Sequence, residues 1–272
     1  MSDFAGYPID DEDRAYLSTL ANESPVLAMR GTYSEVKLDP REIIPVENQG
    51  QQGACAGHSL TSVLEWCYAI GTGGQKLQLS RAMGYYETQR IDGINGDRGS
   101  TISGGVKLAK AVGICREELW KYPGRYNAAR PSDWDGVLKD AGKYKIATAI
   151  KITSYDGYRT FLGAGLGGIH QGISWGNGMN GKLINRYTAG GGGHSICALC
   201  LSERVDDQGR PFAWIQNSWS ESFGVSGWQE WSPTAIQQML ANRQTTFIGL
   251  SDMPNIAPRE LSLDDWKRGL NR

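Results

Sequence analysis

The hydrophobic pattern changes period about halfway along this chain of 272 residues. In the first half, apolar side chains recur at the three- and four-residue spacing of amphipathic helices. Later segments such as Lys145–Thr153 and Ile169–Trp175 have the length and composition of strands. Helices first and strands later are typical of an α+β fold, and here they predict two lobes with a site between them.

The sequence predicts several elements within this pattern. The clearest helix runs from Cys55 to Ile70 and ends at a cluster of glycines. Further helices are expected over Asp10–Asn22, Ser80–Arg90 (with Ser80 as N-cap), Ser103–Val112 and Pro233–Asn242. Further strands are expected over Ser195–Leu201, Phe212–Gln216 and Trp228–Trp231, the first two joined by the turn Asp206–Gly209.

These elements predict one main domain between two terminal segments. Residues 1–30 are expected to form an N-terminal arm. Residues 31–242 form the main domain, with a helical lobe over about 31–140 and a β lobe over about 141–242. Residues 243–272 form a polar C-terminal extension that contains Trp266.

Composition excludes several functional classes. With 28 Lys and Arg against 29 Asp and Glu, the chain lacks the basic surface that nucleic-acid binding needs. No apolar run approaches the roughly 20 residues of a membrane span, and the acidic N-terminus has no signal-peptide core. Five cysteines in a chain of this length do not form a disulfide framework. We therefore expect a cytoplasmic or virion-associated protein without nucleic-acid or membrane partners.

The loop Asn48–Cys55 (NQGQQGAC) ends in a cysteine at the expected start of the long helix. Unpaired N–H groups and the helix dipole favour an anion there, so we expect the pKa of the thiol to fall. The glycines allow the loop to fold back and bring Gln49 beside Cys55. The Gln49 amide and the Cys55 N–H would then form an oxyanion hole.

Three segments, in order, resemble those of the papain-like cysteine peptidases. Asn48–Cys55 resembles their nucleophile segment, and Gly192–Ser195 (GGHS) resembles their histidine segment. Trp214–Trp219 (WIQNSW), followed by Gly227 and Trp228, resembles their asparagine segment. The resemblance covers roughly residues 36–231. It implies a papain-like two-lobed fold, with a helical left lobe, a β-barrel-like right lobe and a cleft between them.

The resemblance also implies the catalytic residues. Cys55 is the nucleophile and His194 is its acid and base partner. Asn217 orients the His194 imidazole, and Gln49 stabilises the oxyanion.

Four further residues are expected at the substrate. Gly99 and Ser100 lie where the family places a Gly-Gly pair that holds the substrate backbone. Gly193 lets the backbone approach the cleft next to the catalytic histidine, and Trp219 packs over the contact between His194 and Asn217.

Three positions depart from the family. Ala56 and His58 replace aromatic residues, so the preference for particular substrate side chains cannot be carried over. Gln52 replaces a cysteine, so that family disulfide cannot form. We expect His58 to fill the space of the lost aromatic side chain, with a second imidazole in the cleft as the alternative. His170 is expected to be structural.

Two other kinds of site, a metal site and a serine-hydrolase site, agree less well with the sequence. His194, Cys197 and Cys200 have metal-like spacing, but strand alternation turns Cys197 away from the other two. Ser174 lies in a G-x-S-x-G pattern, yet no Asp or Glu separates it from His194, as a serine hydrolase would require. We therefore expect no metal and no cofactor.

The sequence favours a cysteine endopeptidase that hydrolyses peptide bonds through a thioester acyl-enzyme, acting on a peptide or protein substrate. Two alternatives remain open. One is a narrow amidohydrolase or transpeptidase acting on cell-wall peptides. The other is a structural or binding protein that retains the fold and binds an assembly partner through residues 1–30 and 243–272.

Overall fold

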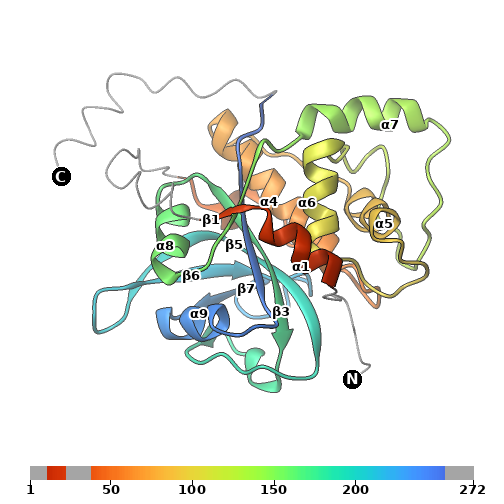
Figure 1. Ribbon diagram of the computed structural model, residues 1–272. Coiled ribbons are helices and arrows are strands. Elements are labelled where there is room, and N and C mark those ends of the chain that lie inside the picture. The colour runs from red at the N-terminus through yellow and green to blue at the C-terminus, as the bar shows by residue number, and fades with distance from the viewer. Residues whose placement is uncertain (1–10, 23–37, 255–272) are drawn as a thin grey trace.

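A computed structural model describes residues 11–22 and 38–254 (Figure 1). The rest of the expected arm and of the C-terminal extension, including Trp266, lies outside these residues. The helices are α1 (Asp11–Ser18), α3 (Pro40–Ile43), α4 (Cys55–Thr72), α5 (Arg81–Asp92), α6 (Ile102–Ala111), α7 (Trp134–Ala141), α8 (Tyr155–Gly163) and α9 (Pro233–Leu240). The strands are β1 (Ala21–Asn22), β2 (Thr148–Lys151), β3 (Gly167–Trp175), β4 (Leu183–Ile184), β5 (Gly192–Val205), β6 (Pro211–Gln216), β7 (Trp228–Trp231) and β8 (Thr246–Ser251).

The described strands form one mixed sheet in the order β1-β2-β8-β3-β5-β6-β7-β4. Helices α4 to α7 gather on one side of Figure 1, while α8 and α9 lie with the strands on the other side. The predicted α+β architecture is confirmed. Alternating side chains of β5 divide between two cores, with Cys197 and Leu199 packed in the helical lobe and Ile196 and Ala198 packed in the β lobe.

Helix α4 runs through the helical core. Leu60, Val63, Leu64 and Cys67 recur at helical spacing and are buried together. The helix ends at Gly73, whose left-handed φ of 73° suits a residue without a Cβ. The boundaries expected for this helix were right at its start and two residues short at its end.

Helices α4 and α5 cross in close contact at Gly57 and Gly84. A Cβ built on Gly57 would lie 2.7 Å from the Tyr85 backbone nitrogen, and one on Gly84 would lie 3.1 Å from the Gly57 carbonyl oxygen. Only glycine therefore lets the two backbones approach this closely. This contact fixes the start of α4, where Cys55 lies, against the rest of the helical lobe.

Gly57→Ala is expected to destabilise the protein by about 1–3 kcal/mol, because the added methyl group overlaps backbone atoms that have no free space to yield. Gly142→Ala is the matched control, since φ there is −58° and no atom lies within 4 Å of the added Cβ. Chemical denaturation of both variants measures the difference. Equal free energies of unfolding for the two variants would contradict the close crossing.

The sequence missed six elements, and one of them changes a domain boundary. Residues 243–272 were expected to lie outside the main domain, but β8 pairs with β2 on one side and β3 on the other. All six residues of β8 are buried. The proposed boundary at 242 is therefore corrected, because a central strand belongs to the fold. The other missed elements are α7, α8 and the short α3, β4 and β1. Strand β1 lies at the end of the segment 10–22 that was expected to be one helix, which instead ends at Ser18.

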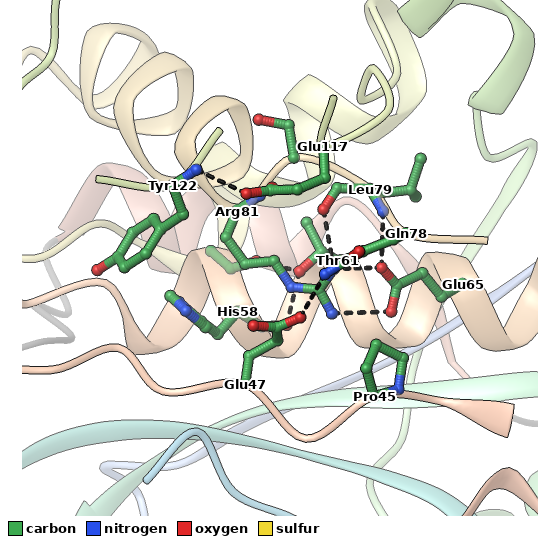
Figure 2. A network of polar contacts seen from close by, with 12 residues as sticks. Pro45, Glu47, His58, Thr61, Glu65, Gln78, Leu79, Arg81, Glu117 and Tyr122 are labelled. Carbon is green, nitrogen blue, oxygen red and sulfur yellow. Dashed lines mark hydrogen bonds and ion pairs between the residues drawn. The ribbon is translucent and has the colours of Figure 1, made fainter. Parts of the chain in front are cut away.

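A buried ion pair joins α4 to the start of α5 (Figure 2). Arg81 donates to both carboxylate oxygens of Glu65 and to the carbonyl of Leu79. Glu65 also accepts the Leu79 N–H at 2.7 Å. Both charged side chains are fully buried, so each depends on the other for its solvation.

Candidate active site

Cys55 is the first residue of α4, and only 1% of its surface is exposed. Ala54 caps the helix without a side-chain hydrogen bond, so the N–H groups of the first turn are available to other acceptors. Backbone N–H groups of Cys55, Ala56 and Ser195 lower the pKa of the thiol. Because Ser195 directly follows His194, the sulfur lies beside the part of β5 that carries the histidine.

Burial nevertheless raises the pKa of the Cys55 thiol to about 12, because desolvation disfavours the thiolate more than these N–H groups favour it. The expectation that a position at the helix start lowers this pKa is therefore wrong for this arrangement. The dipole effect is modest, whereas complete burial removes the solvation of a full charge. The sulfur is accordingly a neutral thiol.

His194 lies near the start of β5, with 5% of its surface exposed. Its Nε2 is 2.9 Å from Asn217 Oδ1, and this oxygen also accepts the Ser218 N–H at 2.7 Å. An amide oxygen only accepts hydrogen bonds, so Nε2 carries the proton and Nδ1 carries the free electron pair. Asn217 reaches this position because it follows β6, whose last residue Gln216 pairs with Cys197 of β5.

Two tryptophans enclose the imidazole. Trp219 stacks on His194 with ring centroids 4.5 Å apart and an interplanar angle of 24°, while Trp175 meets it edge-on at 5.0 Å. The Trp219 position is the one that the resemblance implies, whereas Trp175 was predicted only as the end of a strand. Burial lowers the pKa of His194 to about 4, although the hydrogen bond that His194 donates to Asn217 acts in the opposite direction.

Gln49 lies next to this group, and its side chain is held at both ends. Its Nε2 donates to the Gln52 carbonyl at 2.8 Å, and its Oε1 accepts from the Ser218 hydroxyl at 2.6 Å. Its backbone N–H also donates to the Ser218 carbonyl at 2.9 Å. Since Nε2 has two hydrogens, one N–H is left for an anion.

Three residues without a predicted site role hold the oxyanion loop in place. Ser218 orients the Gln49 amide as described, and the Tyr122 hydroxyl donates to the Gln49 carbonyl at 3.0 Å. Gln52 donates to the Pro123 carbonyl and accepts from the Tyr86 hydroxyl, each at 2.8 Å. The side chain that replaces the family cysteine therefore still ties this loop to distant segments, through hydrogen bonds.

The expected substrate residues differ in what they offer. The Gly99 N–H donates a hydrogen bond to the Tyr85 hydroxyl, and the Gly99 carbonyl accepts one from the Gln89 amide. Among the described residues, Ser100 makes no hydrogen bond through its backbone, and its buried hydroxyl is also unpaired. Gly193 is half-buried in β5, opposite Ser174. Ser100 and Gly193 therefore remain candidates for binding a peptide, whereas the Gly99 backbone is already engaged.

The other two histidines are buried and neutral. His58 donates from Nδ1 to the Ala54 carbonyl at 3.0 Å and meets the Tyr122 ring edge-on at 4.7 Å. Burial and the nearby charge of Arg81 lower the pKa of His58 to about 3. His170 contacts the Ser59 hydroxyl at 2.7 Å inside the protein, and burial lowers its pKa to about 3.

Three further findings concern metal binding, a separate cavity and membrane insertion. Within residues 11–22 and 38–254, no group of three or more His, Cys, Asp or Glu side chains is arranged to hold a metal ion. A cavity of about 740 Å³ lies among residues 39–46, 76–78 and 221–228, and none of the predicted site residues lines it. Of the helices in the described part of the chain, none has the length and apolar character needed to cross a membrane.

No protein-family model matches the sequence, and no curated protein matches it. Solved structures do. Xylellain, a cysteine protease from Xylella fastidiosa, matches with a TM-score of 0.69 and 23% identity, over 92% of this chain and 97% of xylellain. The proform of the ragweed cysteine protease Amb a 11 matches with a TM-score of 0.67 and 18% identity, over 92% and 77% of the two chains.

A third match is procathepsin B from Trypanosoma congolense, with a TM-score of 0.65 and 17% identity, over 91% of this chain and 86% of that one. At these identities the likeness establishes the fold. The two-lobed arrangement predicted from three short segments is confirmed, and this chain has the fold of the papain-like cysteine proteases.

Proposed function

We propose that this protein is a cysteine peptidase that hydrolyses peptide bonds through a thioester acyl-enzyme. One observation carries the proposal. His194 is held by Asn217 in the tautomer whose Nδ1 can accept a proton, and the residue after His194 contacts the Cys55 sulfur. A nucleophile, a base and a group that orients the base are the parts that this chemistry needs.

Attack and proton transfer occur together in this mechanism. Burial keeps both the Cys55 thiol and the His194 imidazole neutral. His194 Nδ1 therefore takes the thiol proton as the sulfur attacks the substrate carbonyl carbon. The imidazolium that forms is stabilised by Asn217 and then gives its proton to the departing amine. Water next attacks the thioester with His194 as base, which releases the acid and restores the thiol.

The negative charge on the tetrahedral intermediate falls beside Gln49. The free N–H of the Gln49 amide and the Cys55 backbone N–H are the two donors for this oxyanion. Because Ser218 and Gln52 hold the amide of Gln49, it does not have to reorganise during the reaction. Ser100, Gly193 and Trp219 are the proposed substrate contacts. Since Cys55 and Ser100 are almost fully buried, peptide binding requires the residues that cover them to move aside.

Thiol labelling of the full-length protein near neutral pH tests the proposal. Two structural neighbours, bromelain from Ananas comosus and a cysteine protease from Carica candamarcensis, are described in complex with the inhibitor E-64. We expect E-64 and iodoacetamide to label Cys55 at least about tenfold faster than Cys67, Cys115, Cys197 or Cys200, because in the proposed mechanism His194 is the base for Cys55. Peptide mapping by mass spectrometry identifies the labelled residue. Equal labelling of all five cysteines would exclude an activated nucleophile.

A substrate comparison separates this function from its alternatives. We expect turnover of casein or of a peptide library. Release of cell-wall peptides without casein cleavage would instead identify a narrow amidohydrolase. Binding of a protein partner that depends on the terminal segments, with no turnover in either assay, would identify a binding protein.

A further inference from the structure

A small cavity lies behind the candidate catalytic residues. Ten residues line it: Glu47, His58, Ser59, Ser62, Ser195, Ile196, Cys197, Gln216, Asn217 and Ser218. The centre of a water-sized sphere has about 10 Å³ in which to move there, which is room for one water molecule. The cavity therefore lies between α4 and the two strands that position His194 and Asn217.

One donor on this cavity has no partner. Asn217 is 3% exposed, and its Oδ1 is fully used by His194 and Ser218. Its Nδ2 forms no hydrogen bond with any of the described residues. A buried amide nitrogen without an acceptor costs free energy on the order of 1–3 kcal/mol, so an acceptor is expected beside it.

The cavity also offers acceptors. The Nδ1 of His58 donates to the Ala54 carbonyl, and the ring is neutral because burial and Arg81 keep its pKa low. Nε2 of His58 therefore carries a free electron pair. Glu47 adds a carboxylate, one oxygen of which already accepts from Gln78 at 2.7 Å. Asn217, His58 and Glu47 therefore line one cavity that has room for a single water molecule between them.

We propose that a single water molecule occupies this cavity, accepts a hydrogen bond from Asn217 Nδ2 and donates to His58 Nε2 and the Glu47 carboxylate. His58 is thereby a positioning residue. It acts through the water to keep the Asn217 amide from rotating, and so keeps Oδ1 on His194. A buried water with about three hydrogen bonds is the usual arrangement in proteins. The effect on catalysis rests on the proposed peptidase function.

Two measurements test the water without relying on activity. A high-resolution crystal structure of the full-length protein should show solvent density within hydrogen-bond distance of both Asn217 Nδ2 and His58 Nε2. Nitrogen NMR should show the His58 ring as a neutral Nδ1–H tautomer with a hydrogen-bonded Nε2. Absence of that density, or a protonated Nε2, overturns the proposal whether or not the protein proves to be a peptidase.

A kinetic cycle tests the positioning role. His58→Phe removes the acceptor and is expected to lower kcat about tenfold, which corresponds to about 1.4 kcal/mol in the barrier, with KM within about twofold. His58→Gln retains an acceptor oxygen and is expected to restore most of the rate. Ser62→Ala, which changes a cavity hydroxyl outside the proposed bridge, is the control and should behave like the wild type.

A double variant tests whether His58 acts through Asn217. In an Asn217→Ala background, His58→Phe should cause no further loss of kcat, because the side chain that it positions is gone. An equal loss in both backgrounds, or an unchanged kcat in the single variant, overturns the positioning role. A wild-type protein without turnover in any assay would instead count against the proposed function, and the density and NMR results would still decide on the water.

Discussion

Cys55→Ala is expected to lower peptide turnover by a factor of at least about 10³, because the acyl-enzyme of the proposed mechanism forms on the Cys55 sulfur. The free energy of unfolding should change by less than about 1 kcal/mol, since the residue loses one sulfur atom at the edge of the core. Turnover and chemical denaturation are measured on the same preparation. A large loss of activity with unchanged stability assigns the effect to chemistry.

Two further variants sharpen this result. Cys200→Ala removes a half-buried thiol on β5 and should retain wild-type turnover. The double variant Cys55→Ala/His194→Ala should be no less active than Cys55→Ala alone, because the nucleophile and its base act as one unit. Residual turnover near the wild-type level in Cys55→Ala would mean that another group performs the reaction.

Arg81→Met is expected to destabilise the protein by about 3–5 kcal/mol at pH 8, because Glu65 must then be buried either as an unpaired charge or as an acid that has bound a proton. Arg81 and Glu65 are 1% and 0% exposed at the side chain, so water cannot take over the lost contact (Figure 2). Chemical denaturation at several pH values measures the effect. A loss of this size is a large share of the roughly 5–15 kcal/mol that stabilises a typical protein.

The destabilisation should depend on pH in a defined direction. Burial raises the pKa of Glu65 to about 7 even with Arg81 beside it, against a value of 4.5 for an ordinary glutamate. Removing Arg81 raises the pKa in the folded state further. Above pH 4.5 the folded protein then binds more protons than the unfolded chain, so its stability falls as pH rises. The loss in Arg81→Met should therefore be smaller at pH 5 than at pH 8.

Two control variants separate charge from packing. Glu65→Gln combined with Arg81→Met removes both charges and should recover most of the stability and abolish the extra pH dependence. Arg159→Met breaks an exposed pair with Asp156, 2.7 Å apart, and should cost less than about 1 kcal/mol. A double variant as unstable as Arg81→Met would show that lost packing, and not the unpaired carboxylate, causes the effect.

Local signals in the sequence were enough for the elements that carry the candidate site. The Cys55 helix, the Ser80 cap and the hairpin from β5 to β6 all follow from spacing and turn residues within a few neighbouring positions. Strand β8 could not be predicted from local signals, because six consecutive buried residues without alternation resemble a short apolar segment of any kind. Its place between β2 and β3 depends on partners about 80 to 100 positions away along the chain.

The chain by itself determined which residue types are available for the chemistry and the order in which they occur, because Cys55, His194, Asn217 and Gln49 belong to short segments with recognisable neighbours. Only the tertiary structure decided the protonation states of these residues and the side chains that contact them and hold them in place. Burial of Cys55 reversed the expected direction of its pKa, and Trp175 and Ser218 gained contacts with the site that no local pattern indicates. Desolvation and packing depend on everything that surrounds a group in space, and most of that is remote in sequence.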